Sequence, residues 1–211
     1  MKNKLTTLGL SLLTLVFLQT SIAATPGFGW VKGNGNVKKE TRDVSNFTGI
    51  DVGGAFEVIL VKANQEKVVL EIDENLLQYV STRVSAGVLR IDNEKDFRNT
   101  TELKVTIYYK NIDQIDLSGA ASLYSQDVLK TEDLEVEASG ASDIELKLDV
   151  ETLEADFSGA SKVEFSGTAG SVEVEASGAT VYKALELQTK SCEIDASGAA
   201  VARIWATESL G

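Results

Sequence analysis

The 211-residue chain contains no histidine, one cysteine (Cys192) and one proline (Pro26). Without histidine it cannot form a Ser-His-Asp or Cys-His catalytic group, and it cannot bind a metal ion through imidazole. A single cysteine allows neither an internal disulfide bond nor a cysteine-rich zinc site. These absences exclude the common nucleophilic and zinc-dependent enzyme classes, and we expect Cys192 to be a small buried hydrophobic residue.

Positive charge is also scarce in this chain. Lysine and arginine number 20 against 32 aspartate and glutamate residues, which gives a formal net charge of −12. Because nucleic-acid phosphates require a basic surface, no nucleic-acid partner is expected. Hydrophobic residues make up 43% and charged residues 25% of the chain, which is typical of a folded domain rather than a disordered one.

The first 24 residues have the composition of an export signal. Lys2 and Lys4 precede a mostly apolar stretch from Leu5 to Leu18, and the small residues Ser21 and Ala23 fit a cleavage site. The apolar stretch is shorter than the ~20 residues that cross a bilayer, which favours a cleaved signal peptide over a membrane anchor. The sequence therefore predicts an exported protein that is periplasmic, displayed on the outer surface or secreted, with no transmembrane anchor in the mature chain. We expect a flexible N-terminal segment over residues 25–36 and a single β-solenoid domain over residues 37–211.

A Ser-Gly-Ala tripeptide recurs through the second half of the chain. It begins at residues 118, 139, 158, 177 and 197, and an alternating segment such as Leu134-Glu-Val136-Glu-Ala138 precedes each of the last four copies. Alternation of this kind indicates strands, and a fixed period near 20 residues indicates stacked repeats. Glycine between two strands suits a sharp corner that other residues avoid. The predicted structural corners are Gly119, Gly140, Gly159, Gly178 and Gly198.

Weaker copies of the same pattern lie upstream. The segments Ile50-Asp-Val52, Leu70-Glu-Ile72 and Leu89-Arg-Ile91 repeat the alternation at similar spacing, and the polar stretch 93–102 is interpreted as a surface loop. Helix-pair repeats need ~33 or more residues, so the shorter period and the valine, isoleucine and threonine content favour strands. The sequence thus predicts an all-β fold, a right-handed parallel β-helix or solenoid of about eight coils with a ~20-residue period.

Three features together resemble one protein family. They are the predicted signal peptide, the block GIDVGGAFEVIL from Gly49 to Leu60, and the Ser-Gly-Ala repeats. They are similar to the auto-transporter adhesin, head GIN domain family of exported bacterial proteins, over roughly residues 37–210. The resemblance implies a β-helical fold and an adhesin-like role without an assigned ligand, and it supplies no catalytic residue.

Acidic side chains occupy two outward positions in each repeated strand, two and four residues before the serine. Stacked like charges oppose each other by ~0.2–1 kcal/mol per neighbouring pair. One interpretation is a solvated face that keeps the sheet from pairing with other chains. The other is a surface for cations, with calcium as the candidate ion, or for an electropositive partner. This candidate interaction face, called the acidic face below, comprises Asp116, Glu135, Glu137, Glu154, Asp156, Glu173, Glu175, Glu193 and Asp195.

The chain is expected to be non-enzymatic and to need no cofactor other than this candidate calcium. Some β-helices degrade polysaccharides with paired carboxylates, but here only the stretch 93–102 departs from the repeat. The predicted function is an adhesin-like interaction module of the bacterial cell envelope, with an envelope or cell-surface protein or glycan as its partner. The alternatives are a structural envelope protein with a cation-binding face, and a polysaccharide-active enzyme.

The repeat register reaches Leu210 near the first inward position of a further coil. An uncapped repeat exposes apolar side chains and an unpaired strand edge. We therefore expect either that the native chain continues or that the end self-associates, with Trp205 in the contact.

Overall fold

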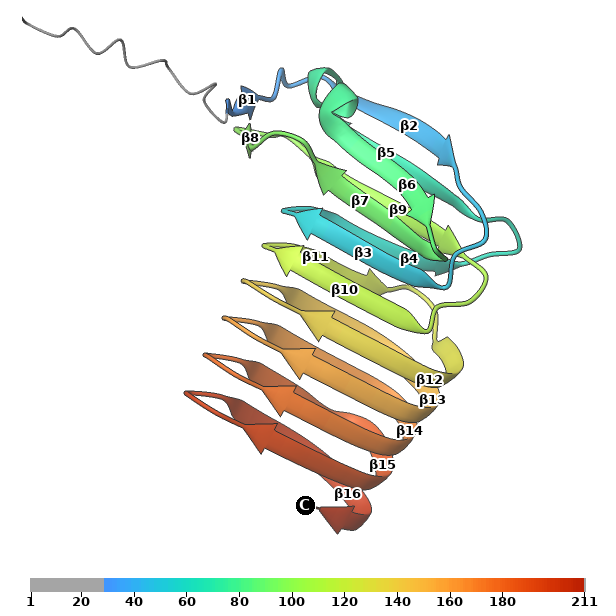
Figure 1. Cartoon of the computed structure of the whole chain (residues 1–211), viewed down its shortest axis with the longest axis vertical. Coiled ribbons are helices and arrows are strands. Elements are labelled where there is room, and N and C mark those ends of the chain that lie inside the picture. The colour runs from blue at the N-terminus through green and yellow to red at the C-terminus, as the bar shows by residue number, and fades with distance from the viewer. Residues whose placement is uncertain (1–28, 211) are drawn as a thin grey trace, which may run out of the picture.

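Alternating apolar and polar residues form strands along most of residues 29–210, the part of the chain that this computed structural model describes (Figure 1). Within these residues the one helix is the short 3-10 helix η1 (Glu74–Tyr79), which buries Leu76 and Leu77. The strands are β1 (Val31–Lys32), β2 (Val37–Asp43), β3 (Gly49–Gly54), β4 (Glu57–Lys62), β5 (Lys67–Asp73), β6 (Val80–Ser85), β7 (Val88–Asn93), β8 (Phe97–Arg98), β9 (Leu103–Tyr109), β10 (Gln114–Gly119), β11 (Ser122–Ser125), β12 (Leu129–Ala138), β13 (Asp143–Phe157), β14 (Lys162–Ala176), β15 (Val181–Ala196) and β16 (Val201–Leu210).

The all-β prediction is confirmed, but the prediction of a right-handed parallel β-helix, or solenoid, of about eight coils is wrong. The main sheet has mixed strand orientation, because β2 pairs antiparallel with β5, β5 with β9, and β6 with β7. Its path begins at β2 and ends at β6. Arg42 of β2 donates hydrogen bonds to the Val80 carbonyl and the Thr82 hydroxyl of β6, so the sheet curls into a nearly closed, barrel-like form.

The error lies in strand direction. Alternation shows that Leu70-Glu-Ile72 is a strand, but it carries no information on whether the neighbouring strand runs the same way. In the structure this segment belongs to β5, between β2 and β9, whereas Ile50 of β3 lies directly beside Leu89 of β7. Chain order and spatial order therefore differ in the first half of the molecule.

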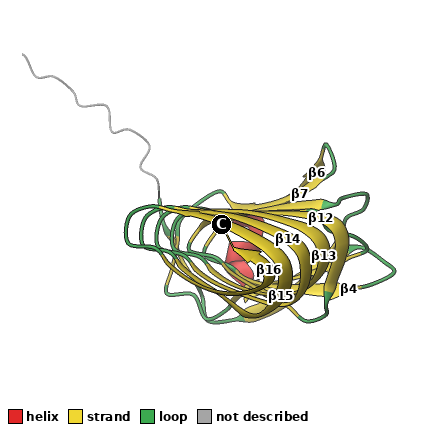
Figure 2. Ribbon diagram, turned by 90° about the horizontal axis from the view of Figure 1, so that it is seen from below, coloured by secondary structure: helices red, strands yellow, loops and turns green. Residues whose placement is uncertain are grey.

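Parallel pairs extend the sheet from β3 and β4 toward the C-terminal end. On one side β3 pairs with β10 and β10 with β12, and on the other β4 pairs with β11. The long strand β13 pairs with both β11 and β12, so it joins the two sides, and β14, β15 and β16 follow it in order. Figure 2 shows the strands curving around a common interior, from which the β6–β7 hairpin projects.

The interior is filled by the inward side chains of these strands. Ile50, Ile115, Val136, Ala155 and Val174 are all buried and lie opposite one another in neighbouring strands. Three buried aromatic rings, of Phe157, Phe165 and Tyr182, pack with centroids 5.7–6.2 Å apart. Cys192 is also buried, as expected, and burial raises the pKa of its thiol.

The predicted corner glycines all have positive φ, between 79° and 93°. Backbone pairing continues through the corners, since the Ala160 amide donates to the Gly140 carbonyl at 2.7 Å. A Cβ atom on Gly159 would lie 2.3 Å from the same carbonyl oxygen. Three buried hydroxyls that the repeat pattern did not indicate reinforce the turns, because Ser142, Ser161 and Thr180 donate to the carbonyls of the preceding corner serines.

The predicted signal peptide, residues 1–24, lies outside the described residues. In the expected flexible segment 25–36, β1 pairs with β8, and the Gly35 amide donates to the buried Asp73 carboxylate at 2.6 Å. The division of the chain into 1–24, 25–36 and 37–211 stays a prediction.

Candidate functional site

The pairing register aligns the acidic face in two columns on neighbouring strands. In the first column, Asp116 of β10 lies opposite Glu137 of β12, and Asp156, Glu175 and Asp195 continue on β13, β14 and β15. In the second column, Gln114 of β10 is followed by Glu135, Glu154, Glu173 and Glu193. All nine predicted residues therefore lie on one side of the sheet, and each has a like charge beside it.

The charges of the acidic face are not neutralised by basic side chains. Among the described residues, none of its nine carboxylates lies within 4.0 Å of a lysine or arginine nitrogen. Elsewhere on the same strands, acids are paired across rows, since Lys130 contacts Asp149 at 2.6 Å and Lys162 contacts Asp143 at 3.3 Å. Most other acids of these strands are unpaired too, so the face is distinguished by its register, which places its acids directly opposite one another in successive strands.

Two residues that the sequence pattern alone did not assign to the face belong to the first column. Asp51 of β3 lies opposite Asp116, and Arg90 of β7 lies opposite Asp51 and contacts its carboxylate at 3.0 Å. Arg90 therefore ends the acidic column on the β7 side. The alternating segments Ile50-Asp-Val52 and Leu89-Arg-Ile91 already indicate that Asp51 and Arg90 point outward. Assigning them to this column also requires knowing that β3 lies between β10 and β7.

Asp116 is the member of the face that is most perturbed by its surroundings. It is half-buried, unlike the exposed acids that follow it. Partial burial raises the pKa of Asp116, and the neighbouring carboxylates of Asp51 and Glu137 raise it further. The attraction of Arg90 opposes these effects without cancelling them. Repulsion between neighbouring carboxylates of the column therefore contributes to the raised pKa of Asp116.

The exposed acids surround a depression of about 420 Å³ on the sheet. Its floor includes Ala155, and its walls are the carboxylates of six face residues: Glu135, Glu137, Glu154, Asp156, Glu173 and Glu175. Among residues 29–210, no group of three acidic or cysteine side chains is arranged to hold a metal ion. Calcium binding at this surface stays a prediction.

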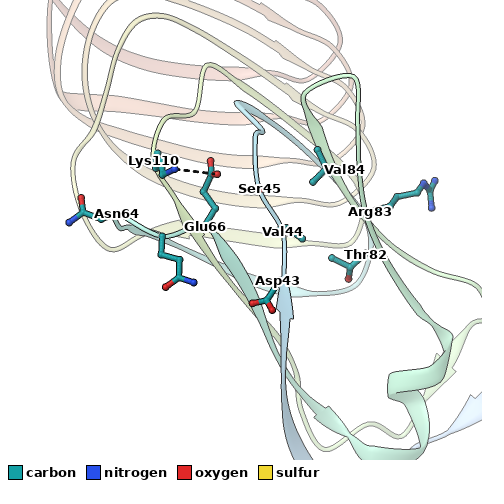
Figure 3. Close-up of a pocket in the computed structure, with 10 residues that line it drawn as sticks. Asp43, Val44, Ser45, Asn64, Glu66, Thr82, Arg83, Val84 and Lys110 are labelled. Carbon is teal, nitrogen blue, oxygen red and sulfur yellow. Dashed lines mark ion pairs between the residues drawn. The ribbon is translucent and has the colours of Figure 1, made fainter.

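A second hollow, of about 540 Å³, lies at the other end of the molecule, between β2 and β6 (Figure 3). Glu66 is buried beside it, accepts a hydrogen bond from the Asn46 amide at 3.0 Å, and lies 3.8 Å from the Lys110 ammonium group. In Figure 3 the Glu66–Lys110 pair lies on one side of the hollow and Thr82 and Val84 lie on the other. No sequence motif indicated this hollow, because its walls come from four separate segments.

The expected C-terminal contact region is partly exposed. Trp205 is 64% exposed and Val201 is 46% exposed, and β16 pairs with β15 along one edge. Self-association through this end stays a prediction. Within residues 29–210, no helix has the length and apolar character needed to cross a membrane.

These features define an all-β domain with an extended, unneutralised acidic surface. The chain belongs to the family described as "Putative auto-transporter adhesin, head GIN domain", whose model matches residues 46–211. The resemblance drawn from the Gly49–Leu60 block and the Ser-Gly-Ala repeats is thereby confirmed. No curated protein matches the chain.

Several solved bacterial structures have a similar fold. A putative adhesin from Bacteroides fragilis is 20% identical, with a TM-score of 0.79 over 85% of each chain. A putative lipid binding protein from Parabacteroides distasonis is 20% identical, with a TM-score of 0.73 over 86% of this chain and 87% of that one. A putative adhesin from Parabacteroides merdae is 18% identical, with a TM-score of 0.61 over 78% of this chain and 80% of that one. At these identities the likeness establishes the fold.

Proposed function

We propose that the protein is an exported, non-enzymatic, adhesin-like module of the bacterial cell envelope that binds an electropositive partner on its acidic face. Membership of an adhesin-type family supports the general role. The observation that carries the specific proposal is the register, which stacks the nine unpaired acids of the face in two columns of one sign on neighbouring strands. A partner that supplies lysine or arginine would relieve repulsion that the folded chain leaves uncompensated.

The competing explanation is that the acidic face only keeps the protein soluble. That explanation predicts a different arrangement of charges in the sequence. Solubility requires charge on the surface but no particular arrangement of it. Alternating lysine and glutamate along the columns would protect the sheet from aggregation equally well and would remove the repulsion between rows. One column that is acidic on five strands and a second that is acidic on four favour a partner of the opposite sign.

The test compares two variants with the same net charge. The face variant carries Glu154→Gln, Asp156→Asn, Glu173→Gln and Glu175→Gln, and the control variant carries Glu132→Gln, Glu151→Gln, Glu164→Gln and Glu186→Gln. All eight side chains are exposed and lie in the same half of the chain. Binding of a fluorescent lysine 20-mer is measured by anisotropy at two salt concentrations.

We expect the face variant to bind the lysine peptide about tenfold more weakly than the wild type, because it removes the charges that the partner faces. The control variant should lose affinity only slightly, since long-range attraction alone is screened by salt. Equal losses in the two variants would show that net charge, rather than the acidic columns, attracts cationic partners.

A further inference from the structure

Residues 33–36, called the N-terminal loop below, contain the one asparagine of the chain that a glycine follows. Asn34 precedes Gly35, and every other asparagine precedes a larger residue. In such a pair the glycine nitrogen can attack the carbonyl carbon of the asparagine side chain, because glycine has no Cβ to obstruct the approach. The product is a five-membered succinimide ring, which water opens mainly to isoaspartate. Asn34 and Gly35 are both exposed, so the pair is chemically reactive wherever the backbone is free to move.

In the folded protein the backbone amides of this pair and of the next residue are all hydrogen-bonded. The Asn34 amide donates to Oδ1 of Asn75 at 3.0 Å, and the Gly35 amide donates to Oδ1 of Asp73 at 2.6 Å. The Asn36 amide donates to Oδ1 of Asn34 itself, at 3.0 Å. The N-terminal loop is thereby docked on the end of β5 and on η1.

The Asp73 carboxylate occupies the position that the reaction needs. When the ring closes, the new bond from the Gly35 nitrogen to Asn34 Cγ replaces the N–H bond, and that N–H bond points at Asp73. Loss of the proton would also place a negative nitrogen beside a negative carboxylate, and a neighbouring like charge disfavours the ionised form. Asp73 is itself fixed, because it is fully buried and accepts from the Thr101 amide at 2.7 Å. The docked loop is therefore protected from ring closure.

Isoaspartate at position 34 would not fit the docked loop. It runs the main chain through the former side chain, which adds one backbone atom and displaces the Gly35 and Asn36 amides from their acceptors. The Asn34 carbonyl that accepts from the Asn36 amide becomes part of the main chain. The reaction also creates a new carboxylate in a loop that already contacts the acids Asp73 and Glu74.

We propose that Asn34 is a modification site that reacts when the N-terminal loop leaves Asp73, and that the isoaspartate formed there keeps the loop undocked. The Gly35 nitrogen bonds to Asn34 Cγ, its proton passes to water, and the side-chain nitrogen leaves as ammonia. A water molecule then opens the ring, so the reaction requires no cofactor and no second protein. A reversible opening of the loop thus becomes a permanent one. This proposal is independent of the acidic face.

The experiment follows Asn34 in four proteins held at pH 8: the wild type, Asp73→Asn, Asn75→Ala and the control Asp96→Asn. Asp73→Asn removes the charged acceptor, and Asn75→Ala removes two hydrogen bonds to residues 32 and 34. Asp96 is exposed and supplies a matched loss of one carboxylate. The wild type unfolded in urea gives the unprotected rate. Peptide mapping by mass spectrometry, with isoaspartate methyltransferase labelling, measures conversion at position 34.

We expect the folded wild type to react about a hundredfold more slowly than the unfolded chain, the factor for roughly three net hydrogen bonds between loop and body. Asp73→Asn should react about tenfold faster than the wild type, since it loses one hydrogen bond to a charged acceptor. Asn75→Ala should also react faster, and Asp96→Asn should match the wild type. Circular dichroism reports folding, and Asn75→Ala decides the role of docking if Asp73→Asn does not fold.

The release of the loop is measured separately. The isoaspartate form, made in urea and refolded, should be cut by trypsin after the exposed Lys32 about tenfold faster than the unmodified protein, because cleavage requires an undocked backbone. Three results would overturn the proposal: equal reaction rates in the folded and unfolded wild type, folded Asp73→Asn and Asn75→Ala variants that react no faster than Asp96→Asn, or an isoaspartate form that resists trypsin as well as the unmodified protein does.

Discussion

Two carboxylates show how placement decides what an acidic residue does for this protein. The pKa of Asp116 is raised by burial and by the neighbouring acids Asp51 and Glu137. Burial also acts to raise the pKa of Asp73, but hydrogen bonds from the Thr101 and Gly35 amides outweigh it, and the pKa of Asp73 is lowered. Ionisation of Asp116 therefore opposes folding, whereas ionisation of Asp73 favours it.

Replacement of Asp116 by asparagine should stabilise the protein at neutral pH. The folded carboxylate has a higher pKa than the unfolded one, so its charge costs stability above the folded value, and the cost fades as the pH falls through it. We expect a gain on the order of 0.5 kcal/mol at pH 7, within the range for opposed like charges. Urea denaturation at pH 7 and at pH 4 measures the gain and its disappearance. Glu132→Gln, at an exposed position, serves as the control. A loss of stability at pH 7 would contradict the repulsion argument.

Replacement of Asp73 by asparagine should have the opposite effect. Asp73 is fully buried and accepts hydrogen bonds from the amides of Gly35 and Thr101, which tie the N-terminal segment to the loop before β9. An unsatisfied buried donor costs ~1–3 kcal/mol. Because the folded pKa is lowered, the wild-type advantage is present above the unfolded carboxylate pKa of about 3.9 and is lost as the pH falls through the folded value. Guanidinium denaturation as a function of pH, with the exposed Asp96→Asn as control, measures this dependence. A variant as stable as the wild type at pH 7 would show that these bonds are dispensable.

At the scale of an element, the corners are tighter than a positive φ alone requires. Gly159 has φ of 92°, and a Cβ atom there would lie 2.3 Å from the Gly140 carbonyl of the neighbouring corner. Gly87, in the turn of the β6–β7 hairpin, has φ of 80°, but a Cβ atom there would meet nothing within 4 Å. The two glycines share a backbone conformation and differ in steric surroundings.

Replacing Gly87 and Gly159 by alanine separates the cost of a positive φ from the cost of a steric clash. Gly87→Ala should cost ~1–2 kcal/mol, the ordinary cost of a left-handed conformation for an L-residue. Gly159→Ala should cost at least ~1–3 kcal/mol more, because a rigid backbone carbonyl cannot move aside without disturbing two rows of the sheet. Denaturant midpoints of the two variants measure the difference. Equal midpoints would show that the corners relax readily around a side chain.

The strands illustrate what a sequence of this kind can and cannot predict. Alternation placed the acidic side chains on outward positions, and the repeat spacing aligned Glu137 with Asp156 in register, because both follow from local periodicity. Strand direction does not follow from local periodicity. β5 and β7 have the same alternation, yet β5 is antiparallel to both of its neighbours. The hollow beside Glu66 was also beyond prediction, because the four segments that line it are far apart in the sequence.

Over the whole molecule, charge is divided unevenly along the chain. Residues 29–112 contain twelve basic and twelve acidic residues, whereas residues 113–211 contain six basic and twenty acidic residues. The first half lines the 540 Å³ hollow of Figure 3, and the second half carries most of the acidic face. One end of the elongated body is therefore neutral and the other strongly negative, so a cationic surface would attract the protein by its β12–β15 end.

The same division predicts how the protein responds to salts. Because the acids of the face lie opposite one another and most are exposed, added salt should weaken their mutual repulsion by screening. We expect sodium, magnesium and calcium chlorides at equal ionic strength to raise the melting temperature alike, and the four-residue face variant to gain less from each. Differential scanning fluorimetry measures these shifts, with the four-residue control variant in parallel. A melting temperature that calcium raises well beyond magnesium, and that the face variant abolishes, would instead establish the acidic columns as a calcium site, since stacked carboxylates are suitable ligands for that hard cation.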